Sequence, residues 1–400
     1  MTGARGPIAA GSPDFRRINR AMAFGGFSVF AMLYCVQPLM PLLARDFSLT
    51  PAQGSLALSV STATLAVALL VSGALADRIG RKQIMVASMV GGALLTLLSS
   101  FALDYIQLVG ARALLGLVLG GLPAVAMAYL SDEIEGASLG LSMGMYIGGS
   151  ALGGMSGRVL SSIVSDVTSW RIALALLGVA GLYAAWEFSR SLPPSRHAGI
   201  VHVRGPGWRD GLRIHLRDAG LPWLFVLPFL MMGVFVSLYN YIGYRLLAPP
   251  FGLSQSEVGA VSLLYLLGIV SSMWAGKLAD RLGRRNVLWL VLGIMLAGLL
   301  VTLHDSVAAI VLGTGLATFG FFASHSVASS WVGRRARPPQ ALASSIYLFS
   351  YYVGSSVIGW CTGYVWEHWA WPGVVAALGA LLGVALGIAL RLRYLAPATR

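Results

Sequence analysis

The sequence has few charged residues, only two cysteines and no acidic residue near the middle of its long apolar runs. Charged residues make up 11% of the 400 residues, hydrophobic residues 57%, and the mean hydropathy is +0.76. Soluble domains carry about 25% charged residues, so this shortage of charge excludes a soluble globular chain. Cys35 and Cys361 both lie in apolar runs, which offers no disulfide framework. We expect both thiols to be buried packing residues.

All 15 Asp and Glu residues fall between the apolar runs or at their ends. This distribution excludes a carboxylate in the middle of a span, where proton-transporting membrane proteins often place one. The only mid-span side chain that ordinarily titrates near neutral pH is His325. A lone histidine is also a common packing residue, so both interpretations stay open. No cluster of metal-ligating residues stands out, and we expect neither a metal ion nor a cofactor.

Long apolar runs fill most of the chain. A bilayer core about 30 Å thick needs roughly 20 apolar residues per helix, and twelve runs approach or exceed this length. They fall near residues 21–44, 54–76, 84–103, 106–130, 138–163, 171–189, 221–244, 256–278, 287–303, 306–332, 341–364 and 372–390. The first is too long for the core of a signal peptide, so it is a retained span. The predicted fold class is an all-α, multi-pass membrane protein.

The formal net charge of +13 comes from basic residues whose positions along the chain match the predicted topology. If the N-terminus is inside, 23 of the 28 Lys and Arg residues lie in inner tails and turns, and only Arg45, Arg171 and Arg245 lie in outer ones. This positive-inside bias sets orientation. We therefore expect both termini to be cytoplasmic and do not expect nucleic-acid binding.

A repeated turn divides the chain into two similar halves. The string GALADRIGRK at residues 73–82 returns about 200 positions later as GKLADRLGRR at residues 276–285, each between two apolar runs. The shared positions are Gly73, Asp77, Arg78, Gly80, Arg81 and their counterparts Gly276, Asp280, Arg281, Gly283, Arg284. The predicted organisation is a tail at 1–20, a six-helix half at 21–189, a linker at 190–220, a six-helix half at 221–390 and a tail at 391–400.

This paired turn resembles the signature loop of the major facilitator superfamily of secondary transporters. The resemblance implies twelve spans in two pseudo-symmetric six-helix halves, and it implies that the turns latch the cytoplasmic side during gating. The alternative is a basic turn that only sets topology. Further strings, such as those at residues 34–39, 240–245 and 325–331, resemble the YnfM-like bacterial inner-membrane transporters, a group linked to efflux.

Arg112 begins a string, residues 112–120, that resembles the R-x-x-x-G-x-x-x-G pattern of this family. It lies roughly 9 Å inside its span at about 1.5 Å per residue, where an ionised arginine is costly unless paired or hydrated. The resemblance implies a role in proton coupling or contact with an anionic group, so Arg112 and His325 are the coupling candidates. Outward snorkelling of Arg112 is the alternative.

The fifth span is rich in glycine. Residues 149–154 match the antiporter motif of proton-coupled exporters in this family, except that Ser150 replaces proline, which removes a kink and weakens the export assignment. Arg158 lies near the outer end, and snorkelling and an outer-gate role stay open. Glycine pairs four residues apart predict helix packing faces. They are Gly116 and Gly120, Gly144 and Gly148, and Gly149 and Gly153.

Aromatic and amide side chains gather on the spans that face the central cavity in this family. Such groups suit a mixed, partly apolar organic ligand, although packing explains some of them. The substrate-site candidates are Tyr34, Gln37, Tyr146, Tyr239, Asn240, Tyr241, Tyr265, Phe322, Tyr347 and Tyr351.

The linker contains a candidate amphipathic helix. Trp208, Leu212 and Leu216 stand four residues apart, beside an equally spaced stripe of arginines from Arg209 to Arg217. This pattern predicts a helix on the inner membrane surface. A solvated linker is the alternative.

The sequence therefore predicts a monomeric bacterial inner-membrane transporter that exports small organic molecules in exchange for protons. An importer or facilitator of sugars or metabolites is the alternative. An enzyme is not expected, because the G-x-S-G string at residues 154–157 is a chance match at this glycine and serine content. A receptor or scaffold would carry large soluble tails, which this chain lacks.

Overall fold

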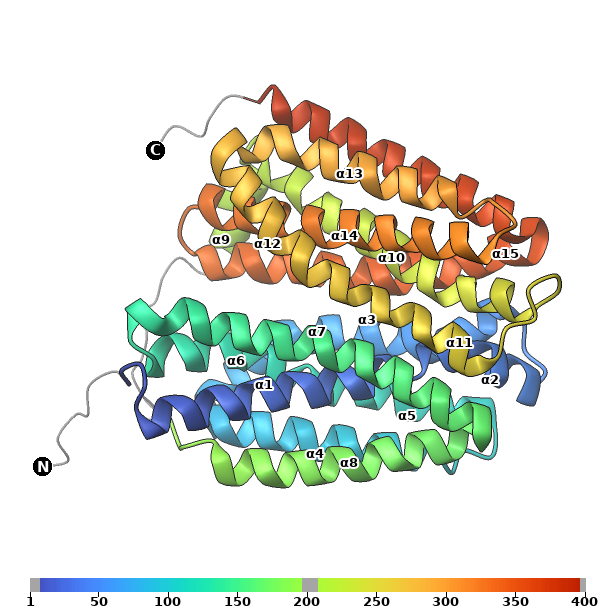
Figure 1. The fold of residues 1–400 in the computed structure, drawn as a ribbon. Coiled ribbons are helices and arrows are strands. Elements are labelled where there is room, and N and C mark those ends of the chain that lie inside the picture. Colours follow the sequence, from blue (N-terminus) through green and yellow to red (C-terminus); the bar gives the residue numbers. More distant parts are fainter. Residues whose placement is uncertain (1–7, 196–207, 396–400) are drawn as a thin grey trace, which may run out of the picture. The chain divides into compact units, whose positions relative to one another are not determined.

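The computed structural model describes residues 8–195 and 208–395, apart from the side chains of Ala74, Asp77 and Trp208. Within them the regular structure is helical except for one bridge between Ile8 and Ile134. The first helices are α1 (Pro13–Tyr34), η1 (Gln37–Leu39), α2 (Met40–Asp46), α3 (Pro51–Ile79), α4 (Arg81–Ser99), α5 (Tyr105–Leu119), α6 (Gly121–Glu133), α7 (Gly136–Val167) and α8 (Trp170–Ser191). The others are α9 (Trp208–Leu216), α10 (Leu221–Leu247), α11 (Gln255–Ala260), η2 (Val261–Leu264), α12 (Tyr265–Leu282), α13 (Arg284–Val301), α14 (Val307–Arg335) and α15 (Gln340–Arg393) (Figure 1).

Short polar residues start several of these helices. The carboxylate of Asp104 accepts a hydrogen bond of 2.8 Å from the N–H of Gln107 at the start of α5. At α11, Ser254 and Glu257 form a reciprocal capping box. These side chains satisfy backbone donors that have no partner within the helix, so the helix starts follow from local sequence.

The described residues account for twelve spans. Ten helices are long and apolar enough to cross a membrane. The longest, α15, is two spans, because Ala370 has a non-helical backbone (φ 48°, ψ −152°) and Pro372 follows. The helix α7 is the twelfth: its 32 residues reach about 48 Å, although glycine and serine on its buried face lower its hydropathy. The all-α, twelve-span fold is therefore as predicted.

The chain groups into two compact units. The first unit comprises Met1–Leu43 and Val60–His202, and the second comprises Ala44–Ser59 and Val203–Arg400. The helix α3 therefore contributes its first residues to the second unit and the remainder to the first. Residues 190–195 and 208–220 of the predicted linker are described, and residues 196–207 lie outside the description.

Glycines bring helix backbones into direct contact in the first unit. A Cβ added to Gly149, Gly153 or Gly157 of α7 would lie 2.0–2.5 Å from a carbonyl oxygen of α1. In the same way, a Cβ on Gly116 would lie 2.0 Å from the carbonyl oxygen of Ser61 on α3. Since lipid gives apolar helices little reason to associate, such close approach is a main source of packing energy.

The pair Gly144 and Gly148 was predicted to pack in the same way, and this prediction is wrong. A Cβ on either residue would meet no heavy atom of the described residues within 4 Å. The two residues share α7 with Gly149 and Gly153, and only the latter pair faces α1. Cys361 also differs from expectation: Cys35 is buried, but Cys361 is exposed on α15.

The second unit repeats the glycine contact. A Cβ on Gly354 of α15 would lie 2.1 Å from the carbonyl oxygen of Phe229 on α10, and one on Gly363 would lie 2.3 Å from the Cα of Ala52. Glu367, one turn further along α15, accepts a hydrogen bond of 2.9 Å from the N–H of Ala52 at the start of α3. The first turns of α3 are therefore closely packed on α15.

The short helix α9 packs on the turn between α14 and α15. The ring of His215 is buried, and its Nε2 lies 3.1 Å from the carbonyl oxygen of Pro339. Asp218, just after α9, accepts hydrogen bonds from Arg335 (2.5 Å) and from the N–H groups of Gly220 and Leu221 (2.8 Å each).

We predict that Gly153→Val lowers the stability of the chain while Gly148→Val does not. The valine at position 153 must displace the backbone of α1, and such overpacking costs about 1–3 kcal/mol. Thermal unfolding of the two purified variants in one detergent checks this. Equal unfolding temperatures would show that the glycine contact is not a source of stability.

Asp218 gives a second prediction, in the acid range. Burial alone would raise the pKa of Asp218, but the hydrogen bonds from Arg335, Gly220 and Leu221 hold this pKa below its ordinary value. The ionised carboxylate of Asp218 thus stabilises the fold by its full amount at pH values above the unfolded-state pKa of about 3.9. This stabilisation is lost as pH falls through the lower folded-state pKa.

Asp218→Asn should therefore cost about 1 kcal/mol at pH 7, and this deficit should disappear in acid. Thermal unfolding of the natural protein and the variant between neutral and acidic pH checks this. Asp210→Asn, at an exposed position on α9, is the matched control and should match the natural protein throughout. A deficit that stays constant with pH would contradict the assignment.

Candidate functional site

The first span is interrupted near Cys35, and Arg112 binds the end of its first helix. The helix α1 stops at Tyr34, and the chain resumes with the short turn η1. The fully buried guanidinium of Arg112, on α5, donates to the carbonyl oxygens of Met32 (3.0 Å) and Leu33. A cation at a helix C-terminus is favourable, because the last carbonyls carry partial negative charge. This position excludes the snorkelling of Arg112 that the sequence left open.

Arg158, on α7, lies at the same interruption. Its Nε donates to the Oε1 of Gln37 (2.5 Å), and its Nη1 donates to the carbonyl oxygen of Gly154 (2.7 Å). Its guanidinium carbon is 4.2 Å from the ring centroid of Tyr34, which is cation–π geometry. The side chain is 2% exposed, so it does not snorkel to the membrane surface. Tyr34 and Gln37, two predicted substrate residues, thus meet at an arginine.

Tyr146 lies elsewhere on α7. It is buried and contacts α1 at Gly26, and its carbonyl oxygen accepts a hydrogen bond of 2.9 Å from Ser150. Twelve residues separate it from Arg158, which is about 18 Å along a helix. The structure therefore does not bring Tyr146 together with Tyr34 and Gln37.

An aromatic cluster surrounds His325 in the second unit. The hydroxyl of Tyr347 lies 3.0 Å from Nδ1 of His325, and either atom can be the donor. The ring of Tyr351 lies 5.0 Å from that of His325, centroid to centroid, and the ring of Phe321 lies 6.2 Å away. Tyr347 and Tyr351 are one turn apart on α15, and Phe321 and His325 are one turn apart on α14, so these faces oppose each other.

The cluster continues through further rings on α10, α12 and α14. Phe235 stacks on Phe321 at 3.8 Å, and Tyr265 lies 5.4 Å from Phe235 and 5.6 Å from Phe322. Tyr239 lies 5.0 Å from Tyr265, and its hydroxyl is 2.8 Å from that of Thr318. Three predicted candidates on these helices, Tyr239, Tyr265 and Phe322, thus join Tyr347 and Tyr351 of α15 in one ring cluster with His325.

Two further substrate-site candidates on α10, Tyr241 and Asn240, make other contacts. The hydroxyl of Tyr241 donates to the carbonyl oxygen of Gly359 (2.8 Å), which ties α10 to α15. The buried amide nitrogen of Asn240 would be 3.3 Å from a Cβ on Gly359. Both residues therefore contact α15 at its glycine face, and neither has a described ring contact with the His325 cluster.

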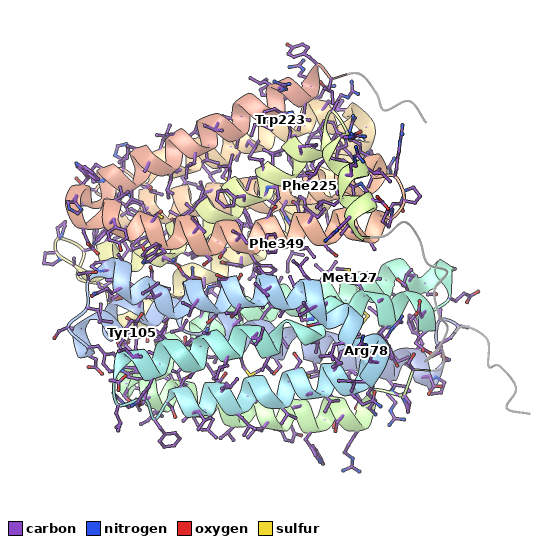
Figure 2. The ribbon with its side chains drawn as sticks, turned by 180° about the vertical axis from the view of Figure 1, so that it is seen from behind. Arg78, Tyr105, Met127, Trp223, Phe225 and Phe349 are labelled. Atoms are coloured by element: carbon purple, nitrogen blue, oxygen red, sulfur yellow. The ribbon has the colours of Figure 1, made fainter. Side chains whose placement is uncertain are left out.

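The repeated turns have the same backbone shape in both units. Gly80 (φ 111°) and Gly283 (φ 83°) occupy the left-handed region that favours glycine, and each precedes an arginine that starts the next helix. Arg78 and Arg281 are exposed at the ends of α3 and α12. In Figure 2, Arg78 and Tyr105 lie at opposite ends of the first unit. This separation fits a turn at one membrane face and the α4–α5 connection at the other.

The arginine after the glycine makes different contacts in the two turns. Arg81 binds Asp132 and the carbonyl oxygen of Ala128 (3.1 Å), both near the end of α6. Arg284 instead binds Asp280 of its own turn (3.0 Å) and the hydroxyl of Ser330 on α14 (3.0 Å). Each turn is thus fixed to the fourth span of its own unit.

The predicted close approach at the glycines that open the two turns is not seen. A Cβ on Gly73 or Gly276 would meet no described heavy atom within 4 Å. The side chain of Asp77 lies outside the described part of the chain, so its predicted latch role has no contacts to report.

The sequence reasoning missed the contact partner of Arg158 and missed Phe235 altogether. For Arg158 the sequence left snorkelling and an outer-gate role open, and its contact with Gln37 was not predicted, since nothing local indicates that Gln37 lies beside it. Phe235 was overlooked, although it stands four residues before Tyr239 and therefore on the same helix face. Helical spacing between aromatic residues was the signal available for Phe235.

Comparison with known proteins gives consistent matches over nearly the whole chain. A sequence model of the Major Facilitator Superfamily matches residues 22–248 and 241–400. The inner membrane transport protein YnfM of Escherichia coli (strain K12) is 47% identical over 385 residues, which cover 96% of this chain and 92% of YnfM. The uncharacterized MFS-type transporter YybF of Bacillus subtilis (strain 168) is 44% identical, with 95% and 94% covered.

Solved structures share the fold at low sequence identity. A bacterial homolog of the human lysosomal transporter Spinster, in an inward-facing and unoccupied conformation, has a TM-score of 0.81 at 14% identity, with 96% of this chain and 98% of that one covered. The nucleoside transporter NupG has a TM-score of 0.77 at 14% identity, with 94% and 100% covered. At this identity the likeness concerns the fold alone.

Arg112 generates a prediction about stability. Arg112→Gln should lower the free energy of unfolding by about 3 kcal/mol, because it leaves the last carbonyls of α1 without a cationic donor in a low-dielectric interior. Thermal unfolding in detergent measures the change. Arg20→Gln, at a side chain that is 60% exposed, removes the same charge and should change stability by less than about 1 kcal/mol. Equal effects would show that Arg112 is not a structural cap.

Proposed function

The chain belongs to the major facilitator superfamily, and from that premise we propose that it exports small organic molecules in exchange for protons. It is a multi-pass secondary transporter rather than an enzyme. Two six-helix halves would expose a central substrate site to each membrane face in turn. The halves, the tails and the linker follow the sequence boundaries given above, with both termini in the cytoplasm of a bacterial cell and the protein acting as a monomer.

The contact between His325 and Tyr347 carries the proposal of proton coupling. Imidazole is the side chain whose ordinary charge change falls between pH 5 and 8, and His325 is the one histidine in the middle of an apolar run. Its Nδ1 lies 3.0 Å from a hydroxyl that can donate or accept as the ring changes protonation. Arg112 is the second coupling candidate, although its bonds to the end of α1 also support a structural role.

The rings around His325 favour an organic substrate with an apolar, flat part. Phe235, Tyr239, Tyr265 and Phe322 present faces and edges at centroid distances of 5.0–5.7 Å. Aromatic surfaces with a few hydroxyl groups are typical of sites for mixed organic ligands. A proton taken up at His325 would change the charge beside this surface and thus the affinity for the substrate.

The twin turns are proposed as cytoplasmic latches. Asp77, Arg78 and Arg81 in the first turn, and Asp280, Arg281 and Arg284 in the second, combine an acidic helix end with basic residues. Charge-assisted hydrogen bonds of this kind form and break between defined partners. The binding of Arg81 to α6 and of Arg284 to α14 supports turns that move with the fourth span of each unit.

An importer or facilitator is the second candidate. The absence of a mid-span carboxylate and the serine at position 150 favour it. Inverted membrane vesicles separate the two candidates by the direction in which substrate accumulates. Accumulation inside inverted vesicles on addition of a proton gradient supports export, and the opposite direction supports import.

We predict that His325→Gln lowers flux driven by a pH gradient by about an order of magnitude and leaves substrate exchange at equal pH nearly intact. Glutamine keeps the size and polarity of the side chain but cannot titrate. Substrate-induced proton release from proteoliposomes measures the coupling, after a thermal-shift screen has supplied a substrate.

His368→Gln is the matched control, because His368 is exposed near the end of a span and bonds only to its own helix among the contacts described. It should leave both fluxes unchanged. A flux in the natural protein that is indifferent to a pH gradient would refute proton coupling.

A further inference from the structure

The short helix α9 holds a buried histidine with one ring nitrogen that has no described hydrogen-bond partner. The side chain of His215 is 0% exposed, and its Nε2 lies 3.1 Å from the carbonyl oxygen of Pro339. Because a carbonyl oxygen only accepts, Nε2 donates in this contact, and the neutral ring leaves Nδ1 without a proton. Nδ1 is buried, and no described residue forms a hydrogen bond with it. Buried polar atoms of this kind are rare in folded proteins, so the position calls for an explanation.

The contacts on both sides of His215 join α9 to the neighbouring ends of α14 and α15. All of these residues belong to the second unit. A Cβ on Gly211 of α9 would lie 2.8 Å from the side chain of Leu342 near the start of α15. Just after α9, Asp218 binds Arg335 at the end of α14 (2.5 Å). The helix α9 therefore ties the end of one span to the start of the next, and His215 lies within this contact.

The groups around His215 disfavour a second proton on its ring. The first turns of α10 and α15, which pack against α9, have no charged or titratable side chain within residues 221–235 and 340–346. The carboxylate of Asp218 already accepts from Arg335 and from two backbone N–H groups. The other charged side chains on α9, directly after it and at the α14–α15 connection are exposed and mostly basic. They are Arg209, Asp210, Arg213, Arg217, Arg334 and Arg337.

We propose that the docking of α9 is a pH-sensitive switch: α9 stays on the α14–α15 turn while His215 is neutral and leaves it when the ring gains a second proton. The charged ring would carry an N–H at Nδ1 that has no described acceptor in a buried contact, which is unfavourable. Once α9 is released, water satisfies the same N–H. A proton that the released state binds more readily favours release. Imidazole charges between about pH 5 and 8, so docking is complete at the alkaline end and weakens as pH falls.

This switch goes beyond the proposed function, because it concerns regulation rather than the transported substrate. The helices α14 and α15 carry His325 and Tyr347, the proposed coupling pair, and docked α9 holds the ends of both helices together. Its release would free these ends to move independently. In the proposed topology α9 faces the cytoplasm, so the switch would respond to cytoplasmic acidification.

Hydrogen–deuterium exchange of the purified full chain, without substrate, tests the switch. The protection of residues 209–216 is measured at about pH 8 and about pH 5.5, near the two ends of the imidazole range, and is corrected for intrinsic exchange at each pH. One linked proton changes an equilibrium by at most about tenfold per pH unit, and we expect protection of α9 to fall by about tenfold over this interval. Equal protection at the two pH values would overturn the inference.

Two substitutions of His215 assign the effect to the charge of the ring. His215→Gln keeps an N–H donor for Pro339 but cannot titrate, so α9 should be equally protected at both pH values. His215→Lys is charged throughout and should give low protection at both. A pH dependence that survives in His215→Gln would overturn the inference. So would a His215→Gln variant that is unprotected at both pH values, because the ring would then be needed for docking whatever its charge.

Two controls separate His215 from other titratable groups. Asp218→Asn should lower the protection of α9 by a similar factor at both pH values and keep the pH dependence, since a carboxylate stays ionised in this range. Loss of the dependence in Asp218→Asn would overturn the assignment to His215. His368→Gln, at an exposed position on α15, should behave as the natural protein does.

The exchange experiment also separates this switch from the proposed function. Protection of α9 is measured without substrate, so an absence of proton-coupled transport would leave the switch in place. Constant protection of α9 would refute the switch and leave the exchange of organic molecules for protons to its own proton-release measurement.

Discussion

A helix that stops inside a bilayer leaves carbonyl groups that lipid cannot satisfy. The helix α1 stops at Tyr34, within the first span, and the guanidinium of Arg112 donates to the carbonyl oxygens of Met32 and Leu33. The rest of the first unit depends on this contact, because it fixes the point at which the chain turns toward Gln37. A guanidinium is suited to the task, since its several N–H groups can bind two carbonyls at once while its charge faces the negative end of the helix.

In the second unit, too, an arginine binds carbonyl oxygens at the end of a helix. Arg245, at the end of α10, donates to the carbonyl oxygen of Thr302 at the end of α13, to that of His304 (3.1 Å), and to Asp305 (2.8 Å). Trp371 also donates to the carbonyl oxygen of Thr302 (2.9 Å). The duplicated halves therefore share glycine contacts and arginine caps. They differ in what surrounds them: cations beside the interrupted first span, and aromatic rings around His325.

The sequence was sufficient for features that depend on composition or on spacing within one helix. Twelve spans, the twin turns and the contact face at Gly149 and Gly153 belong to this class. The sequence prediction was wrong where the position of a neighbouring helix decides the contact. Gly144 and Gly148 have the same spacing on α7, but a Cβ on either would meet no described heavy atom within 4 Å. Cys361 was expected to be buried. Helix positions that face lipid are as apolar as buried positions, so the sequence does not distinguish the two. The meeting of Arg158 with Gln37, 121 positions apart in the chain, has no local signal.

The division of α3 between the two units has a mechanical consequence. Its first turns are held on α15 by the bonds of Ala52 to Glu367 and of Ser356 to Ser59 (2.6 Å), whereas the hydroxyl of Ser61 already bonds to α5 (2.9 Å). A continuous helix is stiff along its axis, so residues 51–59 and 60–79 of α3 are joined without a flexible loop. Any change in the angle between these two parts of α3 must bend the helix near Ser59 or break the bonds that Ala52 and Ser59 make to α15.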